Sequence, residues 1–325
     1  MPRKIFRQAL PQSRILFSTR TFCLIARNNQ FSFRLLGASL LLLSLLFPLP
    51  VWAWNSAGHR LIALIAWDHL APNARSEAAR LLRNHPDFER WTKQVTHADV
   101  DRGTFIEAST WPDEIRKDKR FYSPGSDNPT PTLPGFPDMD RHRNWHFVNL
   151  NLDGSPFEPP TSGLLGKQLA VLTDILGSSS SHSFERSYAL PWLIHLVGDV
   201  HQPLHTSAKQ DTLINNPFNP RKSTSTLHAF WDDLPGPPWL RGERLEAVAS
   251  SLSTAYPQPA NSSSSDQWLA ESWQIAREKG YPTWQEEQTI SARFFQTSRE
   301  ITNRRVTEAG YRLADLLNRL LTARE

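Results

Sequence analysis

The sequence predicts an all-α protein in which residues 54–325 form a single compact domain. Apolar residues recur at the i, i+3, i+4 spacing of helices along much of this segment. Strand-like alternation of apolar and polar residues is scarce, and no internal repeat is visible. The chain has 325 residues, 39% of them hydrophobic, which is enough for a well-buried core.

Four apolar patterns predict the main helices of this domain. They cover residues 61–65, 164–176, 193–197 and about 290–321. Stretches rich in Pro, Ser and Gly at 123–137, 177–183, 214–226 and 256–265 predict loops. We interpret these stretches as connections between helices, not as linkers between domains.

Residues 1–53 are predicted to be a signal peptide with a long basic n-region. This segment has seven Lys or Arg and no Asp or Glu, and its apolar run at 35–53 ends in Val51-Trp52-Ala53, with small residues at −3 and −1. An uncleaved anchor is the alternative, but the apolar run before Pro48 is short for a membrane span. Cleavage would leave Trp54 as the first residue, no stable membrane anchor, and a secreted or periplasmic protein.

The predicted signal peptide also changes the net charge of the chain and holds its single cysteine. The full chain has a net charge of +4, but without residues 1–53, 29 basic and 32 acidic residues remain, a net charge of −3. Bulk charge is therefore no argument for nucleic-acid binding. Because Cys23 is the only cysteine, residues 54–325 can form neither disulfides nor Cys-ligated metal sites. A secreted chain without disulfides is unremarkable in a bacterial envelope and less expected for a eukaryotic secreted enzyme.

Two histidine–aspartate pairs stand one helical turn apart. His195 precedes Asp199 by four residues, and His228 precedes Asp232 by four. Residues i and i+4 share a helix face, so each pair can present a nitrogen and an oxygen to one cation. His195 alone could be a core histidine, but a buried Asp199 is costly unless it is paired or metal-bound.

Further imidazoles extend this pattern. His205 follows Pro203, which disfavours a continuing helix and lets the chain turn another nitrogen toward the site. His146 lies in the apolar segment NWHF. Carboxylate and imidazole ligands without thiolates suit hydrolytic zinc, and a cluster of such ions could generate hydroxide near neutral pH and clamp a phosphoryl group.

Together these residues resemble the zinc-dependent S1/P1 nucleases, which are related in fold to the bacterial zinc phospholipases C. The resemblance covers nearly all of the chain after residue 53. It rests on six ordered segments: WNSAGH at 54–59, WPDEIR at 111–116, WHF at 145–147, HLVGDVHQPLH at 195–205, LHAFWD at 227–232 and AGYRLA at 309–314. It implies a multi-helix domain of the phospholipase C/P1 nuclease type.

The resemblance implies a site for three zinc ions. One ion would be held by Asp113, His146, His195 and Asp199, and a second by His205, His228 and Asp232. The third would be held by His59, by Asp199 as a bridge, and by the amino nitrogen and carbonyl oxygen of Trp54. An α-amino group has a pKa of about 7.7–8.0, so a cation can displace its proton at neutral pH, whereas a peptide nitrogen cannot serve in this way.

The resemblance also implies the reaction. Phosphodiester bonds of single-stranded DNA and RNA would be hydrolysed to 5′-phosphorylated products, and 3′-mononucleotides would lose phosphate. Asp113 would orient the attacking water, and Arg116 would neutralise charge on the phosphate. Phe147 would stack on an unpaired base, near Asn149. We expect no obligate protein partner and a monomer.

Two departures from the family pattern concern the substrate pocket. Asn149 stands where fungal members usually carry Asp, and an amide both donates and accepts hydrogen bonds. The segment 210–225 lacks the Gly-Gly-Asn that commonly precedes LHxxWD. Both departures leave the metal ligands intact.

Two rival functions remain. A zinc phospholipase C shares the fold, but Asp232 in place of Glu and the short spacing from Trp54 to His59 favour the nuclease. A non-catalytic zinc-binding envelope protein would need structural sites, which are usually coordinatively closed. The remaining histidines are expected to be surface or structural residues: His69, His85, His97, His142, His182 and His201.

Overall fold

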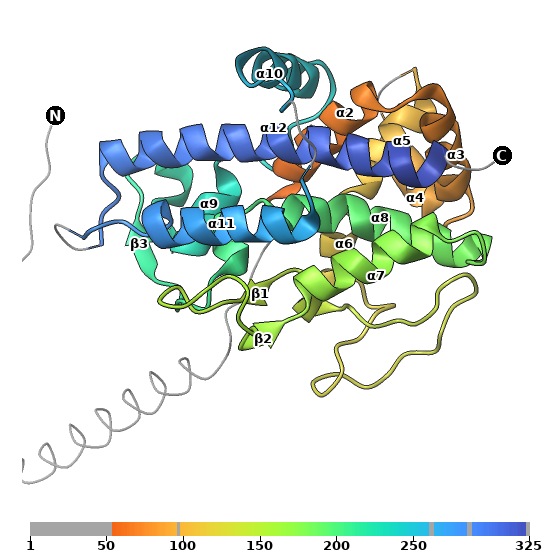
Figure 1. The fold of residues 1–325 in the computed structure, drawn as a ribbon, viewed down its shortest axis with the longest axis horizontal. Helices are drawn as coiled ribbons and strands as arrows, with labels where there is room; N and C mark the ends of the chain where they lie inside the picture. Colours follow the sequence, from red (N-terminus) through yellow and green to blue (C-terminus); the bar gives the residue numbers. More distant parts are fainter. Residues whose placement is uncertain (1–53, 96–97, 260–262, 285–287, 323–325) are drawn as a thin grey trace, which may run out of the picture. The chain divides into compact units, whose positions relative to one another are not determined.

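The computed structural model describes residues 54–95, 98–259, 263–284 and 288–322 (Figure 1). The predicted signal peptide lies outside the described residues. The all-α prediction is confirmed, and the helices are α2 (Ser56–His69), α3 (Pro72–Arg83), α4 (Phe88–Thr92), α5 (Val100–Ala108), α6 (Trp111–Glu114), α7 (Leu165–Gly177), α8 (Ser183–Val200), α9 (Leu227–Asp233), α10 (Gly242–Ala255), α11 (Ser265–Lys279) and α12 (Ala292–Thr322). Within the described residues, no helix is long and apolar enough to cross a lipid bilayer.

Short 3₁₀ turns and two small antiparallel hairpins complete the described structure. The turns are η1 (Ile115–Lys117), η2 (Arg143–Trp145), η3 (Pro203–Thr206) and η4 (Pro220–Lys222). Strand β1 (Val148–Asn149) pairs with β2 (Ser162–Gly163), and β3 (Leu213–Asn215) pairs with β4 (Thr224–Thr226). The prediction of a simple loop at 214–226 is therefore wrong in detail. β-Branched residues in both β3 and β4 favour the extended backbone of this hairpin.

The long helix α12 packs along α2 (Figure 1). Gly310 permits this close approach, because a Cβ at this position would lie 2.6 Å from the Ile65 side chain. Leu61, Ile62 and Ile65 of α2 are buried in the same core. This packing holds α2, which carries His59 and follows Trp54 in the chain.

Helix α8 is the buried centre of the domain. Its residues from Arg186 to Val200 are all buried, and α7 and α3 pack against it. A helix that is apolar on every side is stable only inside a protein, so its few polar residues are carried into the core. After Val200 the chain turns through η3, which contains Pro203 and His205, as predicted from the proline.

Candidate metal centre

Three side-chain atoms from two distant segments meet at the core of the site. His146 Nδ1 lies 3.1 Å from Asp199 Oδ2 and 3.1 Å from His195 Nε2. Asp199 Oδ2 and His195 Nε2 are themselves 3.3 Å apart. Ligands at about 2.05 Å from a tetrahedral zinc ion are separated by about 3.3 Å. The three donors therefore have the spacing of ligands on one face of a zinc tetrahedron.

Two further side chains border this group. Asp113 Oδ1, from α6, is 3.9 Å from both His146 Nδ1 and His195 Nε2. His59, from α2, stacks on the His195 ring with 3.8 Å between centroids. Its Nε2 lies 3.5 Å from Asp199 Oδ1. The two oxygens of Asp199 thus face different histidines, as a bridging carboxylate requires.

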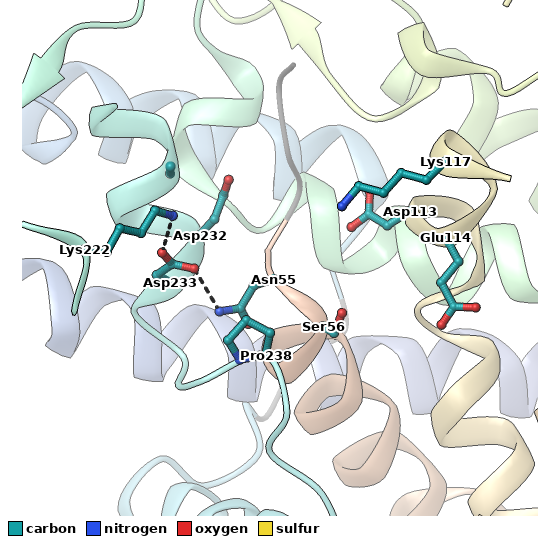
Figure 2. A pocket seen from close by; sticks show the side chains of 10 residues that line it. Asn55, Ser56, Asp113, Glu114, Lys117, Lys222, Asp232, Asp233 and Pro238 are labelled. Atoms are coloured by element: carbon teal, nitrogen blue, oxygen red, sulfur yellow. Dashed lines mark hydrogen bonds and ion pairs between the residues drawn. The ribbon is translucent and has the colours of Figure 1, made fainter. Parts of the chain in front are cut away.

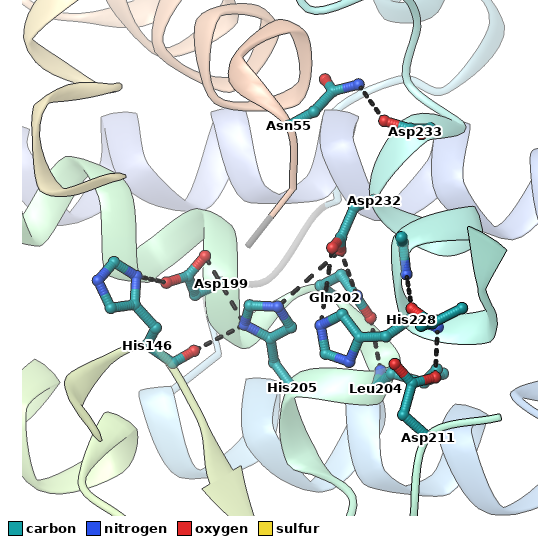
Figure 3. A network of polar contacts seen from close by, with 12 residues as sticks. Asn55, His146, Asp199, Gln202, Leu204, His205, Asp211, His228, Asp232 and Asp233 are labelled. Carbon is teal, nitrogen blue, oxygen red and sulfur yellow. Dashed lines mark hydrogen bonds and ion pairs between the residues drawn. The ribbon is translucent and has the colours of Figure 1, made fainter. Parts of the chain in front are cut away.

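A second group lies beside the first. Ligand atoms of His205, His228 and Asp232 are all within 4.8 Å of one another. His228 Nε2 is 3.7 Å from Asp232 Oδ2, so the i, i+4 pair predicted on α9 forms. Figure 3 shows His205 between two carboxylates, with Nδ1 3.8 Å from Asp199 and Nε2 4.0 Å from Asp232.

Backbone carbonyls orient two of the histidines. His195 Nδ1 lies 2.8 Å from the carbonyl oxygen of Ser109, and His205 Nδ1 lies 2.6 Å from that of His146. A carbonyl only accepts hydrogen bonds, so each Nδ1 carries the proton and donates it. Each Nε2 is then left as a lone-pair donor for a cation, the arrangement typical of metal-ligating histidines.

Several buried polar atoms at the site make no hydrogen bond within the described residues. They are both ring nitrogens of His59, Nε2 of His146, Oδ1 of Asp199 and Oδ2 of Asp232. Buried polar groups are rarely left without a partner, because desolvation without compensation is costly. A cation fits between His59 Nε2 and Asp199 Oδ1, since these two atoms lie 3.5 Å apart and neither makes a hydrogen bond. His146 faces the group through its other nitrogen, Nδ1.

The electrostatics also suit a cation. Burial, reinforced by His195, lowers the pKa of His59 to about 3, and burial lowers the pKa of His146 to about 4, so both rings are neutral at pH 7. Burial raises the pKa of Asp232 well above its usual range. The pKa of Asp199 shifts in the opposite direction. Burial alone would raise it, but interactions with His195 and His146 keep the pKa well below its usual range. Neutral imidazoles bind metals directly, and a bound cation would ionise Asp232.

The indole of Trp54 holds this residue, the first that the structure describes, against α8. Trp54 is fully buried, and its Nε1 donates a hydrogen bond to the Gly198 carbonyl oxygen at 3.0 Å. A Cβ at Gly198 would lie only 2.8 Å from His59 Nδ1. The absence of a side chain at Gly198 therefore allows His59 to approach α8, and the Gly198 carbonyl holds Trp54, one residue from Asp199.

Comparisons with known proteins agree with this geometry. A family model described as S1/P1 Nuclease matches residues 54–322. The chain belongs to the S1/P1 nuclease family. It is similar to three proteins of Arabidopsis thaliana: Endonuclease 5 (23% identity, covering 71% of this chain and 83% of the relative), Endonuclease 1 (23%, covering 84% and 88%) and Endonuclease 4 (22%, covering 83% and 90%). This family is metal-dependent, and the chain is accordingly a hydrolase of ester bonds in nucleic acids.

In this S1/P1 nuclease, a pocket of about 450 Å³ lies next to the candidate ligands (Figure 2). Asp113 and Asp232, one from each group, both line it. Arg116 donates from Nη1 to Asp113 Oδ1 at 3.0 Å, which places a guanidinium beside the site. A pocket of this size can hold a small ligand or part of a larger one.

The two predicted base-binding residues lie on the segment that leaves His146. Phe147 is half-buried, and Asn149 stands in β1, where its side-chain amide donates to the Ser162 hydroxyl at 2.8 Å. Among the described residues, those that line the pocket of Figure 2 include neither of them. The structure brings the metal-ligand candidates together but leaves these two to one side.

Sequence reasoning missed two residues that support the ligands. Gln202 Nε2 donates to Asp232 Oδ1 at 2.7 Å, and Asp211 Oδ1 accepts from the backbone N–H of His228 at 3.0 Å. Gln202 lies within the HLVGDVHQPLH segment, so its position was an available signal. No local pattern marks Asp211, which reaches His228 only through the β3–β4 hairpin.

Proposed function

We propose that this chain is a zinc-dependent endonuclease that hydrolyses phosphodiester bonds of single-stranded DNA and RNA to 5′-phosphorylated products, with 3′-nucleotidase activity. One observation carries the proposal. His146, His195 and Asp199 present three donor atoms 3.1–3.3 Å apart, beside buried nitrogens and oxygens without hydrogen bonds. In an S1/P1 nuclease, such a constellation supports hydrolytic metal chemistry.

We infer three zinc ions per chain. The first ligand set comprises Asp113, His146, His195 and Asp199, and the second comprises His205, His228 and Asp232. The third comprises His59, Asp199 as a bridge, and the amine and carbonyl of Trp54. The separate orientation of the two Asp199 oxygens supports the bridging role, with Oδ2 near His195 and Oδ1 near His59.

The chain's own residues supply orientation and charge. When bound, zinc supplies a hydroxide near neutral pH and polarises the phosphoryl group. Asp113 borders the pocket and is positioned to orient the attacking water. Arg116 is held in place by Asp113 and would neutralise negative charge that develops on the phosphate.

Recognition of single strands would rest on Phe147 and Asn149. An unpaired base can stack on an aromatic ring, and this contact contributes about 1–3 kcal/mol per base. The Asn149 side chain donates one of its two N–H groups to Ser162, which leaves its amide oxygen and its second N–H for a base.

The N-terminal ligand links maturation to activity. Signal-peptide cleavage after Ala53 would free the Trp54 amine in a secreted or periplasmic protein. Buried Trp54 is already anchored to Gly198, next to Asp199. A mature chain that starts elsewhere, or carries a tag on Trp54, should lose the third zinc and activity while the fold remains.

The test combines N-terminal sequencing, metal analysis and activity of the secreted protein. We expect a start at Trp54, three zinc ions, and cleavage of single-stranded DNA or RNA that chelation abolishes and zinc restores. Hydrolysis of phosphatidylcholine without nuclease activity would instead identify a phospholipase C. Bound zinc without either activity would identify a non-catalytic zinc protein.

A further inference from the structure

Two lysines face each other across the pocket of Figure 2. Lys117 comes from η1, which follows the Asp113 helix, and Lys222 comes from η4, within the β3–β4 hairpin. Figure 2 shows their ammonium groups reaching into the pocket from opposite sides, Lys117 on the side of Asp113 and Lys222 on the side of Asp232. The pocket therefore has one cation beside each of these two proposed metal ligands.

Lys222 is held in this position by a chain of contacts. Its Nζ lies 2.7 Å from Asp233 Oδ2, and Asp233 Oδ1 accepts from Asn55 Nδ2 at 3.2 Å (Figure 2). Asn55 also donates to the Gly236 carbonyl oxygen at 2.7 Å and caps α2. The lysine is 47% exposed, so its remaining donors can reach a ligand in the pocket.

A simple surface ion pair does not account for this arrangement. Exposed ion pairs contribute little to stability, whereas this one connects the hairpin, the wall next to Asp232 and the residue after Trp54. The hairpin that carries Lys222 is also the segment whose sequence departs from the family pattern. A side chain that is oriented in advance loses less conformational entropy when it binds a substrate.

We propose that Lys117 and Lys222 bind the phosphate groups on either side of the scissile phosphate, so that the pocket selects oligonucleotides over isolated phosphodiesters. The inference rests on the proposed nuclease function. The scissile phosphate would lie between Asp113 and Asp232, and one lysine reaches into the pocket on the side of each of these residues. Phosphate contacts position a strand without reading its sequence.

The test compares Lys222→Ala, Lys117→Ala and the double variant with Lys93→Ala, a matched exposed lysine on the C-terminal side of α4. Substrates are a single-stranded hexanucleotide and a dinucleoside monophosphate, which has no flanking phosphate. For the hexanucleotide, each pocket variant should raise KM about five- to tenfold, with a much smaller change in kcat. The dependence of log KM on log salt should weaken by about 0.7 per lysine removed.

Two controls separate binding from structure. Lys222→Arg should restore most of the hexanucleotide KM, because it keeps the charge, and Lys93→Ala should match wild type. Unchanged KM and salt dependence in the double variant, or an equal loss on the dinucleoside monophosphate, would overturn the inference. If the wild-type protein cleaves no nucleic acid at all, the proposed function fails instead.

Discussion

Substitution of Gly198 by alanine tests whether His59 and Trp54 form a metal site with Asp199. A Cβ at this position would lie 2.8 Å from His59 Nδ1 and 3.2 Å from Ile62 Cδ1. His59 must move by about 0.6 Å to restore an ordinary contact of 3.4 Å. Functional sites tolerate displacements of about 0.5 Å, so we expect Gly198→Ala to weaken the third zinc site.

The effect on stability should be smaller than the effect on metal binding. Overpacking in a core costs about 1–3 kcal/mol, and replacing a helical glycine with alanine offsets about 1 kcal/mol of that cost. The net destabilisation is then about 0–2 kcal/mol. Gly166→Ala in α7 is the matched control, because a Cβ there would meet Leu269 Cδ1 at 3.3 Å, the mobile end of a side chain.

The assay is zinc content and zinc affinity of the mature protein, measured by elemental analysis and by competition with a chelator. We expect Gly198→Ala to bind the third ion about 10–100-fold more weakly, and Gly166→Ala to match wild type. Thermal unfolding with and without chelator shows whether the fold persists. Wild-type zinc affinity in Gly198→Ala, or the same loss in Gly166→Ala, would refute the reasoning.

Three other predictions concern pH, a supporting residue and catalysis. Burial lowers the pKa of His85 to about 3, so the unfolded state binds more protons between about pH 6.5 and 3. The free energy of unfolding should therefore fall as the pH drops through this range, and urea titrations that give a constant value would contradict this. Gln202→Ala removes the donor to Asp232 and should weaken zinc binding at the second group about 10–100-fold, with competition titration as the measurement. Arg116→Ala should lower kcat about 10²–10³-fold on single-stranded DNA while zinc content stays constant, and unchanged kcat would exclude the proposed role.

Local patterns in the sequence predicted the helices α2, α7, α8 and α12, whereas α3, α4, α5, α10 and α11 and the contacts between distant segments were not predicted. The pattern at about 290–321 corresponds to α12 (Ala292–Thr322), because a 3.6-residue period is a local property. The hairpin at 213–226 has no comparable signal, since its two short strands pair across η4. For the same reason Lys222 was not recognised as a pocket residue.

The sequence by itself determined the residue types and the local geometry of the candidate site. The pairs His195–Asp199 and His228–Asp232 share helix faces because i and i+4 are neighbours on any α-helix. Only the tertiary structure decided which pairs meet. The packing of α12 on α2 and the burial of α8 bring His59 within 3.5 Å of Asp199, 140 positions along the chain. Such distances depend on how whole helices fill the core, which no short segment of sequence specifies.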